Sequence, residues 1–346
     1  MNMKVLLIGP YGIGNTILAL PAMKVLRERF PGARIDLLCL LPSVYEMVNF
    51  LPDFRNVLDR SFLLPRNPKD AVGTLKELFR TRYDWSIVLF PSAKLHYNLL
   101  SYLIHAKERI GSKYPDINFR RGHFLNTVNV PVVVGIHDVY QNIRLLSPLG
   151  IDVGKVEVGR LISEWSGEKG KVVGIHPGSK ARDSYRRWSS DKFRSLVRRM
   201  LEELPGYEVR LFFGPDEMEL TGCFKDLASD GRIRLIANRP LREVFREIND
   251  CEIFISNDSG LMHIANFLGC YTISIWGPSD FRRTGPFNEP KKVIYRDVPC
   301  RPCSHTYYVR SHSFRCKRVE CLEKVEVEDV MKAVRTARNE LCTYYT

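Results

Sequence analysis

Ile-Ser-Asn-Asp-Ser-Gly-Leu-Met-His-Ile-Ala, residues 255–265, decides the fold class of this chain. A β-rich run over residues 252–256 stops at a polar turn, and an apolar helical pattern follows at once. Asp258 or Ser259 can cap that helix, and Gly260 lets another group approach the backbone closely. The stretch therefore predicts a strand–turn–helix unit of the kind that builds parallel α/β sheets.

The same turn is a candidate anion site. The first N–H groups of a helix have no partners within the helix and lie at the positive end of its dipole. A phosphate or diphosphate binds well there. His263 follows about one turn into the helix and would add a neutral or cationic donor. An ordinary capped helix beneath a sheet would show the same pattern, so these residues leave both interpretations open.

Strand-like and helix-like runs alternate along nearly the whole chain, which is typical of parallel α/β layers. In the first half we expect strands at 4–9, 34–40, 85–90 and 110–114, and helices at 16–30, 42–50, 71–81, 98–106 and 137–149. After them we expect strands at 172–176, 208–213, 233–236, 252–256 and 271–276, and helices at 190–204, 216–228, 241–249, 260–268 and 327–341.

Residues 150–170 are rich in glycine, serine and charge and have no long apolar period, so they are the best linker candidate. We therefore expect one Rossmann-like domain over residues 1–160 and another over 171–325. Residues 326–346 are expected to form a closing C-terminal helix.

Composition indicates a soluble globular protein, with 346 residues, 45% hydrophobic and 26% charged. No apolar run reaches the roughly 18 residues that span a bilayer. The apolar run near the N-terminus, within residues 4–9, predicts a buried strand. A cytoplasmic protein is expected.

The net charge is +13, and residues 180–199 hold eight basic residues against two acidic ones. Such a stretch suits phosphorylated ligands or anionic membranes; no nucleic-acid-binding motif accompanies it.

Four of the nine cysteines, Cys300, Cys303, Cys316 and Cys321, fall close together. The first two form a Cys-x-x-Cys step, which can hold zinc if a second pair folds back onto it. The second pair is spaced by four residues and the loop between the pairs is irregular. We expect no cofactor and no catalytic metal, and leave a structural metal here as the alternative.

The loop Gly9-Pro10-Tyr11-Gly12-Ile13-Gly14-Asn15-Thr16 follows the first predicted strand. A nicotinamide-binding unit would need a third glycine where Ile17 stands, and an acid at the end of the second strand, whereas Asp36 lies inside it. Dinucleotide binding is therefore disfavoured. The glycines still predict close approach of a ligand, with Asn15 and Thr16 at the mouth.

The second half opens with Gly-Ile-His-Pro-Gly-Ser-Lys at 174–180, a strand that ends in a turn of small residues. The Arg-Arg-Trp step at 186–188 offers a cation that can neutralise a diphosphate. A later strand ends at Gly-Pro-Asp-Glu, 214–217, where a carboxylate could accept hydrogen bonds from ribose hydroxyls or simply cap a helix. No Asp-x-Asp pair occurs, so a metal-bridged diphosphate is not indicated.

In this order, the motifs resemble glycosyltransferase family 9, the ADP-heptose:lipopolysaccharide heptosyltransferases and their relatives. The resemblance covers nearly the whole chain, including Leu-Pro-Ala at 20–22, Phe-Pro-Gly-Ala at 30–33, Gly-Pro-Ser-Asp at 277–280, Arg-Thr-Gly-Pro at 283–286 and Cys-x-Pro-Cys at 300–303. It implies a GT-B fold, in which two Rossmann-like domains face each other across a cleft and the C-terminal one holds the nucleotide sugar.

The resemblance also implies site residues. The turn at 258–260 and His263 would hold the diphosphate, and Arg186 stands where the family usually has a phosphate-contacting lysine. Ser179 would lie near the phosphate and Glu217 near the ribose. The residues that this assigns to the donor are Ser179, Arg186, Glu217, Asp258, Ser259, Gly260 and His263. The acceptor loop would comprise Tyr11, Gly12, Gly14 and Thr16, with Asn15 aligning the acceptor hydroxyl.

One departure from the family concerns catalysis. Where the family usually has Gly-Asp in the first loop, with the aspartate as proposed general base, this chain has Gly14-Asn15. An amide does not accept a proton at neutral pH. Either Asn15 only orients the acceptor and another group takes the proton, or the chain is weakly active or inactive. His96 is the candidate replacement, because its loop is expected to face the cleft; a packing or surface role is the alternative.

The resulting prediction is an inverting glycosyltransferase that moves a sugar, heptose from ADP-heptose by the resemblance, to a lipopolysaccharide core or related surface glycan. We expect it at the inner face of the cytoplasmic membrane, in peripheral contact with anionic lipid and without nucleic acid. The alternatives are a nucleotide-sugar-binding protein that has lost catalysis, which Asn15 favours, and a sugar-nucleotide epimerase of similar shape.

Overall fold

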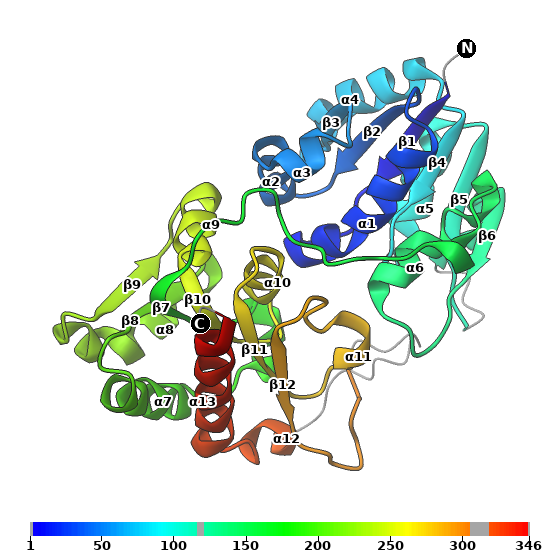
Figure 1. The fold of residues 1–346 in the computed structure, drawn as a ribbon. Coiled ribbons are helices and arrows are strands. Elements are labelled where there is room, and N and C mark those ends of the chain that lie inside the picture. Colours follow the sequence, from blue (N-terminus) through cyan, green and yellow to red (C-terminus); the bar gives the residue numbers. More distant parts are fainter. Residues whose placement is uncertain (1–2, 116–120, 305–317, 345–346) are drawn as a thin grey trace. The chain divides into compact units, whose positions relative to one another are not determined.

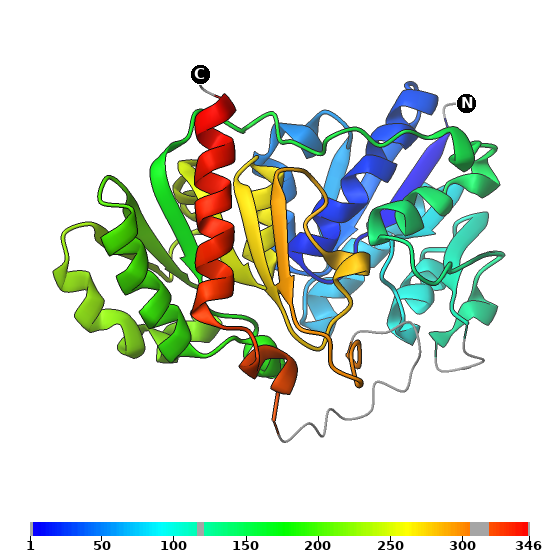
Figure 2. The same cartoon turned by 60° about the horizontal axis from the view of Figure 1, so that its bottom comes forward.

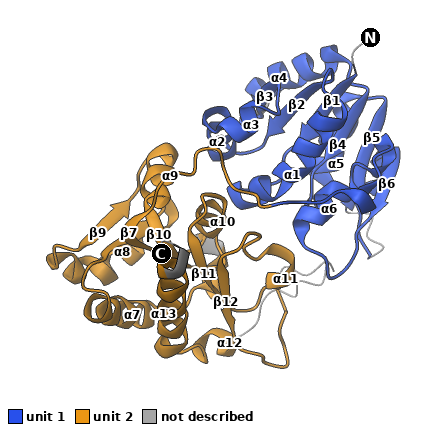
Figure 3. Ribbon diagram, viewed as in Figure 1, with its two compact units in different colours: residues 1–159, 307–310 blue, residues 160–306, 311–346 orange. Residues whose placement is uncertain are grey.

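The computed structural model describes residues 3–115, 121–304 and 318–344. The chain divides into two compact units after Gly159, within the segment expected to be a linker (Figure 3). Each unit contains one six-stranded sheet, and every pairing between strands in both sheets is parallel. The predicted α/β class is confirmed.

The sheet of the first unit has the order β3-β2-β1-β4-β5-β6 (Figure 1). Its strands are β1 (Lys4–Ile8), β2 (Arg34–Cys39), β3 (Arg60–Leu63), β4 (Trp85–Val88), β5 (Glu108–Lys113) and β6 (Val128–Pro131). Its helices are α1 (Ile13–Arg29), α2 (Pro42–Phe50), α3 (Pro52–Arg55), α4 (Pro68–Thr81), α5 (Leu95–Ile104) and α6 (Asp138–Arg144), with 3₁₀ turns η2 (His123–Leu125), η3 (Ser147–Leu149) and, in the segment that follows, η4 (Val153–Lys155).

The sheet of the second unit has the order β12-β11-β10-β7-β8-β9. Its strands are β7 (Gly170–His176), β8 (Glu208–Phe213), β9 (Ile233–Ala237), β10 (Cys251–Asn257), β11 (Tyr271–Trp276) and β12 (Lys291–Tyr295). Its helices are α7 (Ser190–Glu203), α8 (Met218–Thr221), α9 (Leu241–Asn249), α10 (Gly260–Phe267), α11 (Phe281–Thr284), α12 (Glu320–Glu323) and α13 (Val327–Tyr344), with 3₁₀ turns η5 (Ala181–Arg186), η6 (Pro215–Glu217) and η7 (Gly222–Ser229).

The strand order reverses at one place in each sheet: between β1 and β4 in the first unit, and between β7 and β10 in the second. In doubly wound sheets, the loops at the carboxyl ends of the two strands at such a point diverge to opposite faces and leave room for a ligand. The loop from Gly9 and the loop from Pro177 leave the sheets at these two points. Topology alone therefore selects two candidate binding edges.

The second unit is closed by its last helix. Figure 2 shows α13 running along the sheet, and it packs against α7, β11 and β12. Val330, Met331 and Val334 of α13 are fully buried in the same hydrophobic core as Trp188 and Phe193. The helix expected over 326–346 is thus part of the second unit's core rather than an appendage.

Two predicted helices are wrong in extent. The helix expected over 137–149 ends at Arg144, because Pro148 has no N–H to donate to the carbonyl four residues before it, and the chain continues as the 3₁₀ turn η3. The helix expected over 216–228 is broken into η6, α8 and η7. Its break is at Glu217, whose φ of −129° and ψ of 8° leave the helical region.

Strands β3, β6 and β12 were absent from the prediction. Each lies at the edge of its sheet, and two of them have only four residues. Edge strands carry polar side chains and alternate weakly, so their sequence signal is faint. None of the helices in the described ranges combines the length and hydrophobicity that a bilayer crossing requires.

Candidate functional site

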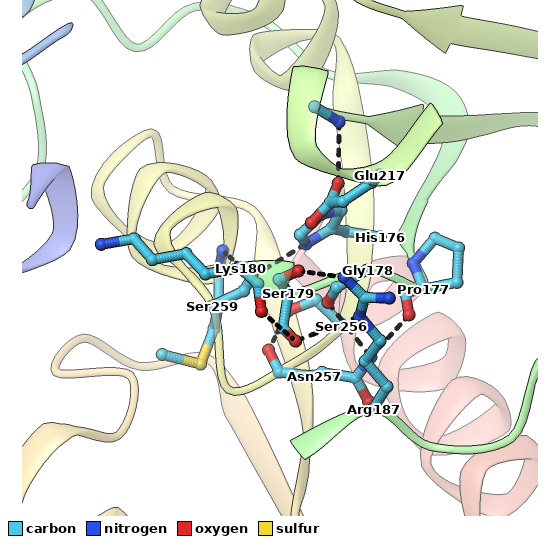
Figure 4. A network of polar contacts seen from close by, with 12 residues as sticks. His176, Pro177, Gly178, Ser179, Lys180, Arg187, Glu217, Ser256, Asn257 and Ser259 are labelled. Atoms are coloured by element: carbon cyan, nitrogen blue, oxygen red, sulfur yellow. Dashed lines mark hydrogen bonds and ion pairs between the residues drawn. The ribbon is translucent and has the colours of Figure 1, made fainter. Parts of the chain in front are cut away.

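A network of polar contacts in the second unit lies at the carboxyl ends of β7 and β10, where the strand order reverses (Figure 4). His176 is the last residue of β7 and Asn257 the last residue of β10. The two strands are hydrogen-bonded neighbours, with Ser256 in register with His176. Their ends bring together the motif at 176–180 and the turn at 257–260, which are far apart in sequence.

The Asn257 side chain fixes the positions of the backbone segments at this edge. Its side chain is fully buried, and its amide donates to the carbonyls of Pro177 at 2.8 Å and Gly178 at 3.2 Å. Its carbonyl oxygen accepts the Trp188 N–H at 2.9 Å. One side chain therefore joins the loop after β7, the chain entering α7 and the end of β10, because an amide offers both donors and an acceptor.

Ser259 caps α10. Its hydroxyl oxygen accepts the Met262 N–H at 3.4 Å, so Ser259 is the capping residue of the two that the sequence offered. The same hydroxyl lies 2.9 Å from Nδ1 of His176, as Figure 4 shows. The N-terminus of α10 is therefore tied directly to the end of β7.

His176 carries the network on to Glu217. Its Nε2 lies 2.9 Å and 3.1 Å from the two carboxylate oxygens, one of which also accepts the Gly214 N–H at 2.7 Å. Because an ionised carboxylate only accepts, Nε2 must carry a proton. Nδ1 then accepts the Ser259 hydroxyl when the ring is neutral, and donates to it when the ring is protonated.

Glu217 is kept ionised in a buried place. Burial alone would raise its pKa, but the charge and hydrogen bond of His176, the Gly214 N–H and the charge of Arg187 together lower it below its ordinary value. Gly178 gives the carboxylate room: a Cβ there would lie 2.3–2.6 Å from the Glu217 carboxylate atoms. Gly178 and the break in the predicted helix therefore both help to position the Glu217 carboxylate.

Arg186 is the buried cation of this edge. Its Nη1 donates to Asp258 at 2.9 Å, directly before the helix cap. Burial acts to lower its pKa, but Asp258 and Asp183 raise the pKa above the ordinary value overall, so the guanidinium stays charged. Its Nε and Nη2 are buried without a hydrogen-bond partner among the described residues. Buried donors of this kind are rare in folded proteins and call for a partner.

His263 lies one turn into α10 and is almost fully buried. Burial lowers its pKa to about 4, against a smaller raising effect of Asp258. The imidazole is therefore neutral at pH 7, which decides between the neutral and cationic donors that the sequence allowed.

The Ser179 hydroxyl is engaged inside its own loop. It donates to the Asp183 carbonyl at 3.0 Å, and Arg187 approaches it through Nε at 3.3 Å and donates to the Ser179 carbonyl at 2.6 Å. Arg187 also pairs with Glu219 at 3.1 Å. The neighbouring arginines thus differ: Arg187 braces the loop, whereas Arg186 keeps donors available.

Three residues of the network were not selected from sequence: His176, Asn257 and Arg187. The signal that could have found the first two is their position. Each is a polar residue at the carboxyl end of a strand, and the two strands are neighbours at the reversal of strand order. Local sequence hides that adjacency, because 80 residues separate them.

The basic stretch at 180–199 is not a free cationic surface. Six of its residues form ion pairs with acids of the same unit: Arg186, Arg187, Lys192, Arg194, Arg198 and Arg199. Several partners, such as Asp226, Glu326 and Glu328, lie well outside the stretch in sequence, which is why the local count was misleading. The expectation that this segment offers a cationic face to lipid stays a prediction, although most of its cations have acidic partners in the same unit.

In the first unit, the end of β4 is held by the fully buried Asn142, which accepts the Phe90 N–H at 2.9 Å and donates to the Phe90 carbonyl at 3.2 Å, whereas the loop after β1 is less connected. Gly12 has φ of 125°, which requires glycine, and forms the N-terminal boundary of α1 without any side-chain cap. Asn15 lies in the first turn, half-buried, and its amide donates to the Tyr11 carbonyl at 3.2 Å. Thr16 is a correction: it is fully buried and its hydroxyl donates to the Gly12 carbonyl at 3.0 Å, so it supports the loop instead of lining its mouth.

His96 lies in the first turn of α5 rather than in the loop before it. Its side chain is exposed, and its ring lies 4.4 Å from that of Tyr97 between centroids. Partial desolvation and, second, the charge of Lys94 lower its pKa below the ordinary value. It is therefore neutral and able to accept a proton at pH 7.

The cysteine segment is only partly described. Cys316 lies in residues 305–317, outside the described residues, so the metal alternative stays a prediction. Within the described ranges, no group of three or more His, Cys, Asp or Glu side chains is placed to hold a metal. Cys321 is buried on α12, and Cys300 is exposed.

Comparisons with known proteins agree with the fold described above. Lipooligosaccharide heptosyltransferase 2 of Campylobacter jejuni subsp. jejuni serotype O:6 is 22% identical, over 96% of this chain and 98% of that protein. The structure of Escherichia coli ADP-heptose lipopolysaccharide heptosyltransferase II has a TM-score of 0.73 at 19% identity, covering 97% of this chain and 98% of that one. A family 9 glycosyltransferase of Veillonella parvula has a TM-score of 0.74 at 19% identity, covering 98% of both chains.

The two solved structures establish the fold, and each unit here is one of the two Rossmann-like halves of a GT-B glycosyltransferase. Residues 74–311, more than two-thirds of the chain, match the profile of glycosyltransferase family 9 (heptosyltransferase). This match separates the chain from epimerases of related shape. The chain belongs to glycosyltransferase family 9 and is a glycosyltransferase.

Proposed function

We propose that this protein is an inverting glycosyltransferase that transfers heptose from ADP-heptose to the core of lipopolysaccharide or a related surface glycan. The names of its relatives, lipooligosaccharide and ADP-heptose lipopolysaccharide heptosyltransferases, support both substrates. In this proposal the second unit holds the donor and the first holds the acceptor.

The observation that carries the donor site is Arg186. A guanidinium whose Nε and Nη2 are buried without a partner among the described residues pairs with Asp258, just before α10, and the first N–H groups of a helix have no partner within it. A diphosphate would satisfy both sets of donors and would bring the negative charge that each favours. As the glycosidic C–O bond breaks, charge grows on the leaving diphosphate, and fixed donors there stabilise it. In this proposal the other donor residues assigned from sequence, including Gly260 and His263, contact the same diphosphate.

His176 acts in this proposal by orienting Ser259. The Ser259 hydroxyl lies 2.9 Å from Nδ1 of His176, whose Nε2 is bonded to Glu217 at 2.9 Å. This pairing fixes the ring, and with it the hydroxyl at the N-terminus of α10 where a phosphate would bind. Ribose recognition at Glu217 and phosphate binding at Ser259 would be coupled through one ring.

The chemistry is a single displacement. The acceptor oxygen attacks the anomeric carbon from the face opposite the diphosphate, the bond from that carbon to the diphosphate oxygen breaks, and the acceptor proton passes to a base. Asn15 cannot take that proton, but its amide can align the hydroxyl, together with Tyr11, Gly12 and Gly14 of the same loop. His96 is the proposed base, since its ring is neutral at pH 7.

The test is transfer itself. The full chain, ADP-heptose and a heptose-deficient lipopolysaccharide core should give ADP and an acceptor heavier by one heptosyl unit, both read by mass spectrometry. Absence of the heavier acceptor with ADP-heptose, while another nucleotide sugar supports transfer, would replace the donor and keep the reaction class.

The alternative of a binding protein without catalysis rests on Asn15. Asn15→Asp separates the two: it should create or raise transfer in a decayed enzyme, and leave or lower it where the base has moved. His96→Ala should lower kcat by about 10²-fold or more if His96 takes the proton. Full turnover of His96→Ala with the natural acceptor would remove it from the mechanism.

An acceptor carried by a lipid would require the protein to work at a membrane surface. We therefore include peripheral contact with the inner, anionic face of the cytoplasmic membrane in the proposal. Vesicle binding, described below, tests that part separately from transfer.

A further inference from the structure

Helix α5 presents an apolar face that nothing in the described structure covers. Leu95, Leu99, Tyr102 and Leu103 are 39–51% exposed. Their spacing of four, three and one residues places them along one stripe of the helix. The other side of the helix is anchored, since Tyr97, Ser101 and Ile104 are buried against the sheet. The helix is thus held firmly while its apolar stripe stays in solvent.

Neighbouring elements extend the stripe. On α4, which packs against α5, Phe79 is exposed, and its ring lies 6.1 Å from that of His105 at the end of α5. At the other end, η2 packs against α5 and carries Phe124, which is 66% exposed. We call the side chains Phe79, Leu95, Leu99, Tyr102, Leu103 and Phe124 the α5 face. An exposed apolar surface of this extent marks an interaction site.

Cations without an ion-pair partner among the described residues lie at the margin of the α5 face. Helix α5 contains no acidic residue. Lys94, Arg80 and Arg82 are exposed and form no ion pair among the described residues. The acids that flank the same segments are already engaged: Glu77 pairs with Arg60, Asp84 with Lys107, and Glu108 accepts the Thr127 hydroxyl.

We propose that the α5 face docks on the surface of an anionic phospholipid membrane. Apolar side chains on one helix face with lysine and arginine at the margin match the chemistry of an interfacial helix, in which the apolar groups enter the acyl boundary and the cations meet the headgroups. This proposal names the membrane-binding element within the proposed function, and places it in the first unit instead of in the paired basic stretch of α7.

The experiment is co-sedimentation of the full chain with vesicles of phosphatidylglycerol and phosphatidylcholine, and with vesicles of phosphatidylcholine alone. We expect binding to the anionic vesicles that weakens with salt, and a partition coefficient at least about tenfold lower for the double variant Leu99→Gln, Leu103→Gln. Arg80→Glu with Lys94→Glu should weaken binding mainly at low salt. Met218→Gln, at an apolar side chain of similar exposure in the second unit, is the matched control and should bind as the wild type does.

Three results would overturn the proposal. The wild type could fail to bind anionic vesicles at low salt, or the α5 variants could bind as tightly as Met218→Gln. A wild-type dimer in light scattering that the Leu99→Gln, Leu103→Gln variant dissociates, without any vesicle binding, would assign the face to a second copy of the chain. Vesicle binding in a protein that transfers no sugar would leave this inference intact while the proposed function failed, so the two failures are distinguishable.

Discussion

The two units share one strand order, yet the edges at their order reversals are built differently. Between β7 and β10, buried side chains connect both strands, two loops and a helix cap through Asn257, His176 and Ser259. Between β1 and β4, the loop leading into α1 has no side-chain cap and the Asn15 amide donates to the Tyr11 carbonyl of the same loop, while buried Asn142 holds the end of β4 through Phe90.

The difference indicates which kind of ligand each edge suits. A small charged group of fixed shape, such as a diphosphate, is bound best by donors that are already in place. A large glycan offers many contacts and can order a loose loop as it binds. We therefore expect disruption at the second unit's edge to reduce both stability and nucleotide binding, and disruption of the loop after β1 in the first unit to leave stability nearly unchanged.

The largest effect should come from the matched pair of asparagines. Asn257→Ala leaves the Trp188 N–H and two carbonyls without their partner in a buried place, so we expect a loss of about 3 kcal/mol in the free energy of unfolding. Asn15→Ala should change it by no more than about 0.5 kcal/mol. Urea unfolding followed by circular dichroism measures both; equal losses would mean that the edges do not differ.

A comparable effect should appear on acidification. His263 titrates at about 4 in the folded protein and near 6.5 when unfolded, so the unfolded state binds the extra proton between these pH values. Stability should therefore fall as pH drops from about 6.5 to about 4, with His263 contributing on the order of 3 kcal/mol. The fall should be smaller by that amount in His263→Gln. If the wild type and the variant show the same slope in urea unfolding from pH 7 to pH 4.5, His263 is not the buried neutral group described here.

Two glycines of the same edge should separate stability from binding. Gly178→Ala drives a methyl group into the Glu217 carboxylate, and should lower stability by about 1–3 kcal/mol and weaken ADP binding. Gly260→Ala meets no atom within 4 Å, so stability should hold or rise slightly. If a diphosphate approaches that backbone, Gly260→Ala should still weaken ADP binding by roughly tenfold. Calorimetric titration measures the affinity for ADP. An unchanged affinity in Gly260→Ala would mean that the N-terminus of α10 does not contact the nucleotide.

The smallest effect concerns the basic stretch. Arg194→Ala breaks pairs to Asp226 on the surface, so its effect on the unfolding midpoint should be slight and its binding to anionic vesicles should equal that of the wild type. Reduced vesicle binding by this variant alone would indicate that α7 contacts the membrane, and would contradict the contrast between the two units.

Sequence reasoning went furthest where local pattern and tertiary structure agree. The helix 241–249 and the strands 208–213 and 271–276 were predicted to the residue, because their apolar periods are uninterrupted. The broken helix at 215–229 could not be foreseen, since the break depends on His176 and Gly214 drawing Glu217 out of helical geometry. Three of the four edge strands, β3, β6 and β12, were missed for the related reason that their pairing is decided by the neighbouring strand.

The candidate site shows the same division. The turn at 258–260 was found because a strand, a polar turn and an apolar helix are adjacent in sequence. The roles of His176 and Asn257 depend on which strands become neighbours, and the neutral state of His263 depends on burial, neither of which a local pattern contains. The pairing of Arg194 and Lys192 with distant acids is of the same kind.

The most direct test of the central claim is thermal unfolding of the wild type and Arg186→Gln with ADP, ADP-heptose, UDP and GDP. A ligand that binds only the folded state stabilises it by about 2.7 kcal/mol at a hundredfold excess over its dissociation constant. We predict a clear rise of the midpoint with ADP and ADP-heptose, little with UDP or GDP, and loss of most of the rise in Arg186→Gln. No rise with any nucleotide, or an equal rise in both proteins, would contradict a donor site at the carboxyl ends of β7 and β10.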